Sequence, residues 1–199
     1  MLPLDIKARA LRKAYLDADQ CDLVFHSTTG AKLLTRPEKA YFSDTPTFAV
    51  YAQAFGFPSL VLWVKTQLLE LDLFTEVKVD ADNDTLLGAA RLFAHNYGWV
   101  KLTEFLLFMA RFKLGYYGKF YGYFDPIAIG EAFLSFLKQR SIEIDRLECE
   151  RKTKQREQQQ LQLPEGYTSY TLYQELKERA SKGDRKAIKE LNKWKEISA

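Results

Sequence analysis

The chain has few of the residues that hold metals or form disulfides. Its 199 residues include two cysteines and two histidines. Cys21 and Cys149 lie far apart without any CxxC pair, and His26 and His95 are equally isolated. These spacings exclude a disulfide-stabilised scaffold and a zinc-finger framework. We therefore expect a reduced, cytoplasmic protein with no bound metal.

Long apolar runs are also missing. The sequence contains no stretch of about 18 apolar residues, which is the length that a membrane-spanning helix needs. Charges occur throughout residues 1–20, so the uninterrupted apolar region of a secretory signal is absent. We therefore expect no contact with a membrane.

Recognisable catalytic and cofactor motifs are absent as well. The segment GYYGKFYGYFDP follows a predicted helix and lacks the GKS or GKT of a phosphate-binding loop. The segment VDADNDT resembles the start of a calcium loop, but Thr85 stands where glycine is needed and Arg91 where glutamate is needed. No spacing ties either histidine to a nucleophile. We expect no cofactor.

The residues that are present predict an all-α fold with a substantial core. Hydrophobic residues make up 47% of the chain and aromatic residues 14%, and apolar positions recur three or four residues apart. We expect five or six body helices, the first over residues 3–19. The polar segment 20–43 contains DLVFHS, which could form a short strand or an extended arm. Further helices are expected over 47–55, from Pro58 to 74, after an N-cap at Asp84, from Lys101 or Thr103 to 115, and from Pro126 onward.

Glycines and aromatic residues are concentrated near the middle of the chain. Nine of the twenty residues from 105 to 124 are aromatic. Three of the ten glycines fall within eight positions, at Gly115, Gly118 and Gly122. Glycine permits positive φ angles in a tight connection, and Asp125 followed by Pro126 is typical of a helix start. The sequence therefore predicts a helix–glycine loop–helix unit at the centre of the fold.

The aromatic residues of this loop allow two interpretations. Packed inward, they would fix the loop to the core. Exposed beside lysines, they would suit stacking on single-stranded nucleic acid. We expect core packing for most of the rings. The candidates for contact with nucleic acid or a protein partner are Lys113, Tyr116, Tyr117, Lys119 and Tyr121.

Positive charge is concentrated in the tail. Residues 1–145 contain 16 basic and 17 acidic side chains, whereas residues 146–199 contain 13 basic and 9 acidic ones. The densest basic run supplies four more contact candidates, Arg151, Lys152, Lys154 and Arg156. Glutamates interleave this run at helical spacing, so a solvated helix surface competes with docking as its explanation.

Composition divides the chain into three parts. We expect a helical body over residues 1–148, a charged helical linker over 149–162 and a small helical hairpin over 163–199. The break LPEG begins the last part, and a turn at Gly183-Asp184 would join its two short helices.

The central segment carries a family resemblance. A helix ending in F-x-R-F-K-x-G, then Y-G-x-F-Y-G, then D-P, resembles a family of uncharacterised proteins from mobile elements and prophages of Bacteroides-type bacteria. The likeness covers about half the chain, roughly residues 48–140. The matching positions are Phe108, Arg111, Phe112, Lys113, Gly115, Tyr117, Gly118, Phe120, Tyr121, Gly122, Asp125 and Pro126. The general plan is also similar to phage helicase-loading and replication-adaptor proteins.

The resemblance implies no established activity. With no catalytic motif, we interpret the chain as a non-enzymatic adaptor of a mobile element or phage, acting in DNA replication or element maintenance. A protein partner is expected, and nucleic acid is a second candidate partner. Two other classes stay open: a hydrolase or nuclease with an unrecognised site, and a structural or assembly protein with an exposed apolar face.

Overall fold

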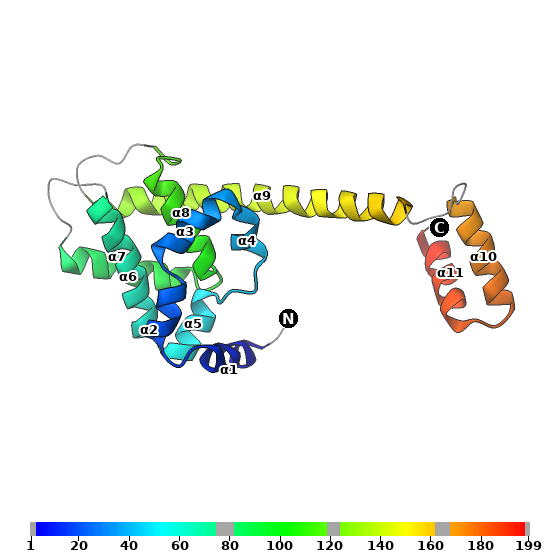
Figure 1. The fold of residues 1–199 in the computed structure, drawn as a ribbon, viewed down its shortest axis with the longest axis horizontal. Coiled ribbons are helices and arrows are strands. Elements are labelled where there is room, and N and C mark those ends of the chain that lie inside the picture. Colours follow the sequence, from blue (N-terminus) through cyan, green and yellow to red (C-terminus); the bar gives the residue numbers. More distant parts are fainter. Residues whose placement is uncertain (1–2, 75–81, 119–123, 162–167, 198–199) are drawn as a thin grey trace. The chain divides into compact units, whose positions relative to one another are not determined.

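The computed structural model describes residues 3–74, 82–118, 124–161 and 168–197. Across these ranges the chain forms α-helices and no β-strand (Figure 1), so the predicted all-α fold is confirmed. None of the described helices is both long and apolar enough to cross a membrane. The helices are α1 (Leu4–Ala14), α2 (Ala18–Val24), α3 (Ser27–Thr35), α4 (Pro37–Phe42), α5 (Phe48–Phe55), α6 (Phe57–Phe74), α7 (Asn83–Asn96), α8 (Leu102–Lys113), α9 (Pro126–Leu161), α10 (Ser169–Ser181) and α11 (Arg185–Ile197).

The chain forms two compact units, Met1–Leu147 and Glu148–Ala199. The first unit, called the body below, contains α1 to α8 and the beginning of α9. The second contains the polar part of α9 together with α10 and α11. The separate roles expected for the linker and the hairpin stay a prediction.

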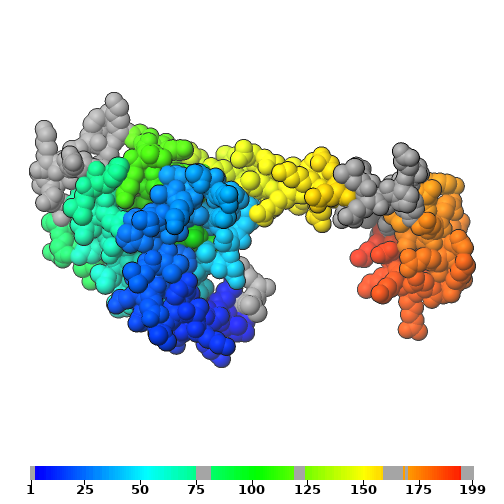
Figure 2. Space-filling model, viewed as in Figure 1, coloured from blue at the N-terminus to red at the C-terminus, as the bar shows by residue number. Residues whose placement is uncertain are grey.

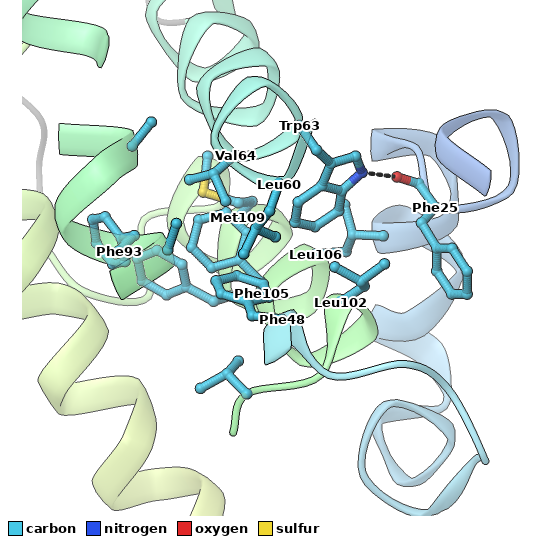
Figure 3. Packing of buried hydrophobic residues seen from close by; sticks show 14 of the residues in the cluster. Phe25, Phe48, Leu60, Trp63, Val64, Phe93, Leu102, Phe105, Leu106 and Met109 are labelled. Atoms are coloured by element: carbon cyan, nitrogen blue, oxygen red, sulfur yellow. Dashed lines mark hydrogen bonds between the residues drawn. The ribbon is translucent and has the colours of Figure 1, made fainter. Parts of the chain in front are cut away.

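Helix α8 lies at the centre of the body, because all its side chains from Leu102 to Met109 are buried. Phe105 is fully buried, and its ring meets those of Phe48, Trp63, Phe93, Phe108 and Phe133. The indole Nε1 of Trp63 donates a 2.9 Å hydrogen bond to the carbonyl oxygen of Phe25 (Figure 3). The aromatic core therefore joins helices that are far apart in the sequence.

The N-terminal region contains more helices than expected. The single helix predicted over residues 3–19 is wrong, since α1 ends at Ala14 and Asp17 caps α2 by accepting a 2.9 Å hydrogen bond from the Gln20 amide. The strand or arm predicted at DLVFHS is also wrong, because this segment forms the end of α2 and the start of α3. The estimate of five or six body helices was therefore too low. The residues before α5, coloured blue, cover much of the body face seen in Figure 2.

Packing against α8 explains why this polar segment is helical. Gly30 of α3 lies so close to α8 that an added Cβ would be 2.7 Å from the carbonyl oxygen of Leu106. This tertiary contact stabilises α3 as a helix, although the helix propensities of such a short segment are too weak to predict one.

Replacing Gly30 with alanine should therefore destabilise the body. Alanine normally favours a helix over glycine by about 1 kcal/mol, but forcing its methyl group against the α8 backbone should cost about 1–3 kcal/mol. Gly88 of α7 is the matched control, since an added Cβ there would meet no heavy atom within 4 Å. Urea denaturation should show a lower free energy of unfolding for Gly30→Ala and a higher one for Gly88→Ala. A higher free energy of unfolding in both variants would contradict the close α3–α8 contact.

Of the two N-caps predicted from the sequence, at Asp84 and Asp125, the structure corrects the first. The N-cap of α7 is Asp82 rather than Asp84, and its carboxylate accepts hydrogen bonds from the amides of Asp84 and Thr85 at 2.9 and 2.8 Å. Helix α9 begins at Pro126, and the Asp125 carboxylate accepts from the Ile127 amide at 2.9 Å. The helix–loop–helix order of the central unit is therefore as predicted.

The second unit has a small core of its own. Leu176 of α10 packs with Ala187 and Leu191 of α11. Gly183 turns the chain with φ +87°, and the Asp184 carboxylate caps α11 by accepting from the Lys186 amide at 2.9 Å. The predicted C-terminal helical module is confirmed.

Candidate partner-binding surfaces

The glycine loop begins with a conventional helix end. Gly115 has φ +79° and Gly118 has φ +103°, and the Tyr116 amide donates to the carbonyl oxygen of Arg111 at 3.1 Å. The positive φ angles explain why glycine occupies these two positions. The predicted positions Lys119, Tyr121 and Gly122 lie outside the described residues.

The two described tyrosines of the loop differ in exposure. Tyr117 packs its ring against Phe108 and Phe112, with centroid distances of 5.7 and 6.3 Å. Tyr116 is 60% exposed. A depression of about 460 Å³ lies between the loop and one side of α9, where small and polar side chains run from Ala128 to Gln139. Tyr116 therefore borders a surface to which a partner side chain could bind.

A partly buried ionic network joins the end of α8 to α4 and α9. The Arg111 guanidinium makes two 2.9 Å contacts with the Glu143 carboxylate, and the Tyr41 hydroxyl donates to the same carboxylate at 2.6 Å. Burial opposes ionisation of Glu143, but the bonds from Arg111 and Tyr41 outweigh it and lower its pKa. Burial also raises the pKa of Tyr117 to about 12. Because Glu143 is ionised and both tyrosines are protonated near neutral pH, the network holds α4, α8 and α9 together rather than exchanging protons.

Lys113 is held against the body. Its ammonium lies 3.7 Å from the Glu70 carboxylate and 5.5 Å from the centroid of the Phe74 ring. Glu70 also accepts from Nε2 of His26 at 3.0 Å, and Nδ1 of His26 lies 3.1 Å from Oγ of Ser27. This order of hydroxyl, imidazole and carboxylate is the order of a catalytic triad. Here, however, Ser27 and His26 are neighbours in the sequence at the start of α3, so the contact is also an ordinary local one.

The basic run of α9 does not form a single face. Each helical residue advances by about 100°, so Arg151, Lys152, Lys154 and Arg156 point in different directions around the axis. Their side chains are exposed, and Arg151 and Glu150 both take part in interactions within the chain. The geometry therefore favours a solvated helix surface for this run.

Helix α11 carries a basic face that the sequence analysis did not single out. The exposed cations among its described side chains lie within about 100° of one another, opposite Ala187 and Leu191, which pack on α10. They are Arg185, Lys186, Lys189 and Lys193. None of them forms an ion pair with another described residue. The i, i+4 and i+8 spacing of the first, third and fourth was the available signal.

Helix α10 carries exposed charges of both signs. Glu175 and Glu178 are accompanied by the exposed cations Lys177, Arg179 and Lys182, and the Lys182 ammonium lies 2.6 Å from the Glu178 carboxylate. Helix α10 therefore has no face of one charge, whereas the cations of α11 share one direction around its axis.

The described residues contain no group of three or more histidine, cysteine, aspartate or glutamate side chains placed to hold a metal ion. His95 instead packs edge-on against Phe57, with ring centroids 6.2 Å apart. Cys21 is buried, and this burial raises the pKa of its thiol to about 12. Its neutral thiol is a poor nucleophile near neutral pH.

Asp22 is a half-buried carboxyl group with a perturbed pKa. The Tyr51 hydroxyl donates to Asp22 at 2.6 Å. Burial raises the pKa of Asp22 to about 6; the Tyr51 bond opposes this shift and the charge of Asp19 adds to it. The folded state therefore holds this proton more tightly than the unfolded chain, in which the pKa has its ordinary value of 3.8.

Stability should consequently fall as the pH rises from about 4 to about 6, because the contribution of protonated Asp22 is lost over that window. Asp22→Asn keeps an acceptor for Tyr51 without the charge. Near pH 7.5 we expect this variant to be more stable than the wild type by about 1–2 kcal/mol, with little difference near pH 3.5. Thermal melts across this pH range test the prediction; an equal offset at both ends would show that Asp22 does not titrate as described.

Comparison with known proteins places the chain in a family. No curated protein and no solved structure matches it. The sequence model of DUF6633, described as a family of unknown function, matches residues 86–186. This range begins in α7, includes α8, the glycine loop, α9 and α10, and ends in α11. Since the match covers half of the chain, the protein belongs to the DUF6633 family.

Proposed function

We propose that the protein is a non-enzymatic adaptor whose α10–α11 hairpin docks on the phosphate backbone of a nucleic acid. The observation that carries this proposal is the basic face of α11, formed by Arg185, Lys186, Lys189 and Lys193. Four cations on one helical face match the closely spaced charges of a phosphate backbone.

The chemistry of these side chains favours affinity without sequence selectivity. Three of the four are lysines, which act as flexible point charges toward phosphate. Contacts of this kind position a protein on nucleic acid but do not read the bases. Specificity in such an adaptor would come from a protein partner bound elsewhere. Tyr116 and the depression beside α9 are the best candidates in the body.

The wider role we propose is DNA replication or maintenance of a mobile element or phage. It is supported by the resemblance of the central segment to proteins of mobile elements and prophages, and by the architectural likeness to helicase-loading proteins. An adaptor of this kind needs one surface for nucleic acid and another for protein, and the hairpin and the body offer one candidate each.

The experiment compares two variants that change net charge equally. In the first, Lys186, Lys189 and Lys193 of α11 are replaced by glutamate; in the second, Lys152, Lys154 and Arg156 of α9 are. Fluorescence anisotropy with short single-stranded and duplex DNA should show a roughly 100-fold loss of affinity for the α11 variant at low salt. The α9 variant should lose much less. Equal losses would mean that only net charge matters, and the docking face would be wrong.

A second measurement separates docking from folding. Deleting residues 161–199 should leave the thermal melt of the body unchanged and abolish DNA binding. If the truncated chain unfolds, the tail is structural. If the wild type ignores DNA but binds a glutamate-rich peptide through α11, the partner is an acidic protein surface.

The alternative of a hydrolase rests on the Ser27–His26–Glu70 arrangement. An active hydroxyl there would hydrolyse an activated ester such as p-nitrophenyl acetate, and Ser27→Ala would abolish the reaction. We expect the wild type and the Ser27→Ala variant to hydrolyse the ester at the same slow background rate.

A further inference from the structure

Helix α6 buries one face and exposes leucines on the other. It packs against α5, α7 and α8, yet Leu62, Leu69 and Leu73 are 62%, 39% and 66% exposed. Single exposed leucines are common on soluble proteins, but three on one helix face point to a contact surface. Thr66, also exposed, lies between them on the same face.

The spacing of these four residues fits another helix. Leu62, Thr66, Leu69 and Leu73 are separated by four, three and four positions, which is the alternation of the d and a positions of a heptad. Side chains in this register pack into the holes of a facing helix. The face is therefore shaped for a helical partner rather than for a flat surface.

Charged residues beside this row of leucines indicate which partner helix fits. With Leu62 and Leu69 at d positions, Lys65 occupies a g position and Glu70 an e position. In a parallel pair of identical helices, each g residue faces the e residue five positions later on the other copy. Lys65 would then meet Glu70 of the second copy, and two-fold symmetry would repeat the pair. An antiparallel pair would place like charges opposite one another.

Both side chains can accept this additional contact. The Lys65 ammonium donates to the neutral Asn83 amide oxygen and has two further N–H donors. The Glu70 carboxylate already contacts His26 and Lys113, the latter at 3.7 Å, and it has about four acceptor sites in total. An intermolecular Lys65–Glu70 pair therefore needs neither existing contact to break.

We infer that α6 is a dimerisation helix through which two copies of this chain associate in parallel. Leu62, Leu69 and Leu73 form the seam, and Lys65–Glu70 pairs border it. The seam is only about two heptads long, so the dimer is a concentration-dependent equilibrium rather than an obligate assembly. This inference does not depend on the proposed nucleic-acid contact. A dimer would nevertheless carry two α11 faces and gain avidity on a long polyanion.

Sedimentation velocity over a concentration series of the full chain tests dimer formation. The wild type should shift from monomer to dimer, whereas Leu62→Glu with Leu73→Glu should stay monomeric at every concentration. Leu92→Glu, on exposed α7 surface, is the matched control and should dimerise like the wild type. A monomeric wild type overturns the inference, as does a dimer that survives both glutamates.

Charge exchange tests the pairing. Lys65→Glu should weaken dimerisation at least tenfold, and adding Glu70→Lys should restore it; thermal melts verify that both variants fold. Failure of the second change to restore dimerisation in a folded protein would refute the Lys65–Glu70 pair.

Cysteine cross-linking tests orientation. In a Cys149→Ser background, Thr66→Cys should form a disulfide dimer on mild oxidation, because an a position faces itself in a parallel pair. Buried Cys21 provides the control for nonspecific oxidation. A dimer that does not cross-link through position 66 would refute the parallel arrangement.

Discussion

Phe105→Ala should lower the free energy of unfolding by about 3–5 kcal/mol, because it removes a fully buried ring that neighbouring side chains cannot replace. The ring touches aromatic side chains from α5, α6, α7 and α9, including Phe48, Trp63 and Phe133. Its removal therefore loosens several helices together. Urea denaturation followed by circular dichroism measures the loss.

Two other phenylalanines calibrate this result. Phe112 precedes the glycine loop and is only partly buried, so Phe112→Ala should cost about 1–2 kcal/mol, less than for a fully buried ring. Phe57 is 42% exposed and should tolerate alanine with a loss of about 1 kcal/mol or less. Equal losses at Phe105 and Phe57 would contradict the position of α8 at the centre of the core.

Arg140→Ala should have an effect of similar size through charge. Nε and Nη2 of Arg140 lie 2.9 and 2.8 Å from one carboxylate oxygen of Glu104, whose side chain is completely buried. Removing the guanidinium would leave this carboxylate with a 3.2 Å hydrogen bond from the Lys101 amide and without an ion pair to another described residue. We expect a loss of about 3 kcal/mol in unfolding free energy, as for other broken buried ion pairs.

Most of this loss in unfolding free energy should come from the buried Glu104 charge left without Arg140, rather than from the lost packing of the Arg140 side chain. Adding Glu104→Gln to Arg140→Ala removes the charge and should recover at least about 1 kcal/mol. The control is Lys182→Ala, which breaks an exposed ion pair with Glu178. It should leave the midpoint of urea denaturation unchanged. If Glu104→Gln deepens the loss, Arg140 stabilises the body by packing alone.

Local signals predicted the long helices and their ends. Asp125-Pro126, Gly115 and the apolar stripe of α6 are short-range features, and short-range features suffice to place a helix start, a helix end and a buried face. The tail was predictable for the same reason, since Gly183-Asp184 separates two amphipathic segments.

The short helices before α5 and the ionic ties could not be predicted, because both depend on contacts between distant residues. Gly30 has a role only because α8 lies against it. Arg111 and Glu143, 32 positions apart in the sequence, meet only once α8 and α9 have packed. The spacing of residues along the sequence does not predict such long-range pairs.

The candidate site illustrates a further limit. A dense basic run such as residues 151–156 attracts attention in a sequence, yet helical geometry spreads its charges around the axis. The four cations of α11 are more widely spaced in the sequence and nevertheless share one face. The proposed docking face therefore rests on the direction of the side chains around the helix axis rather than on local charge density.

The salt dependence of DNA binding tests this docking face most directly. If four cations of α11 contact phosphates, a plot of log K against log salt concentration for duplex DNA should have a slope of about −0.9 × 4, or roughly −3.6. Replacing Lys189 and Lys193 with alanine should reduce the magnitude of that slope by about 1.8. An unchanged slope in this variant would show that the α11 face does not contact the phosphate backbone.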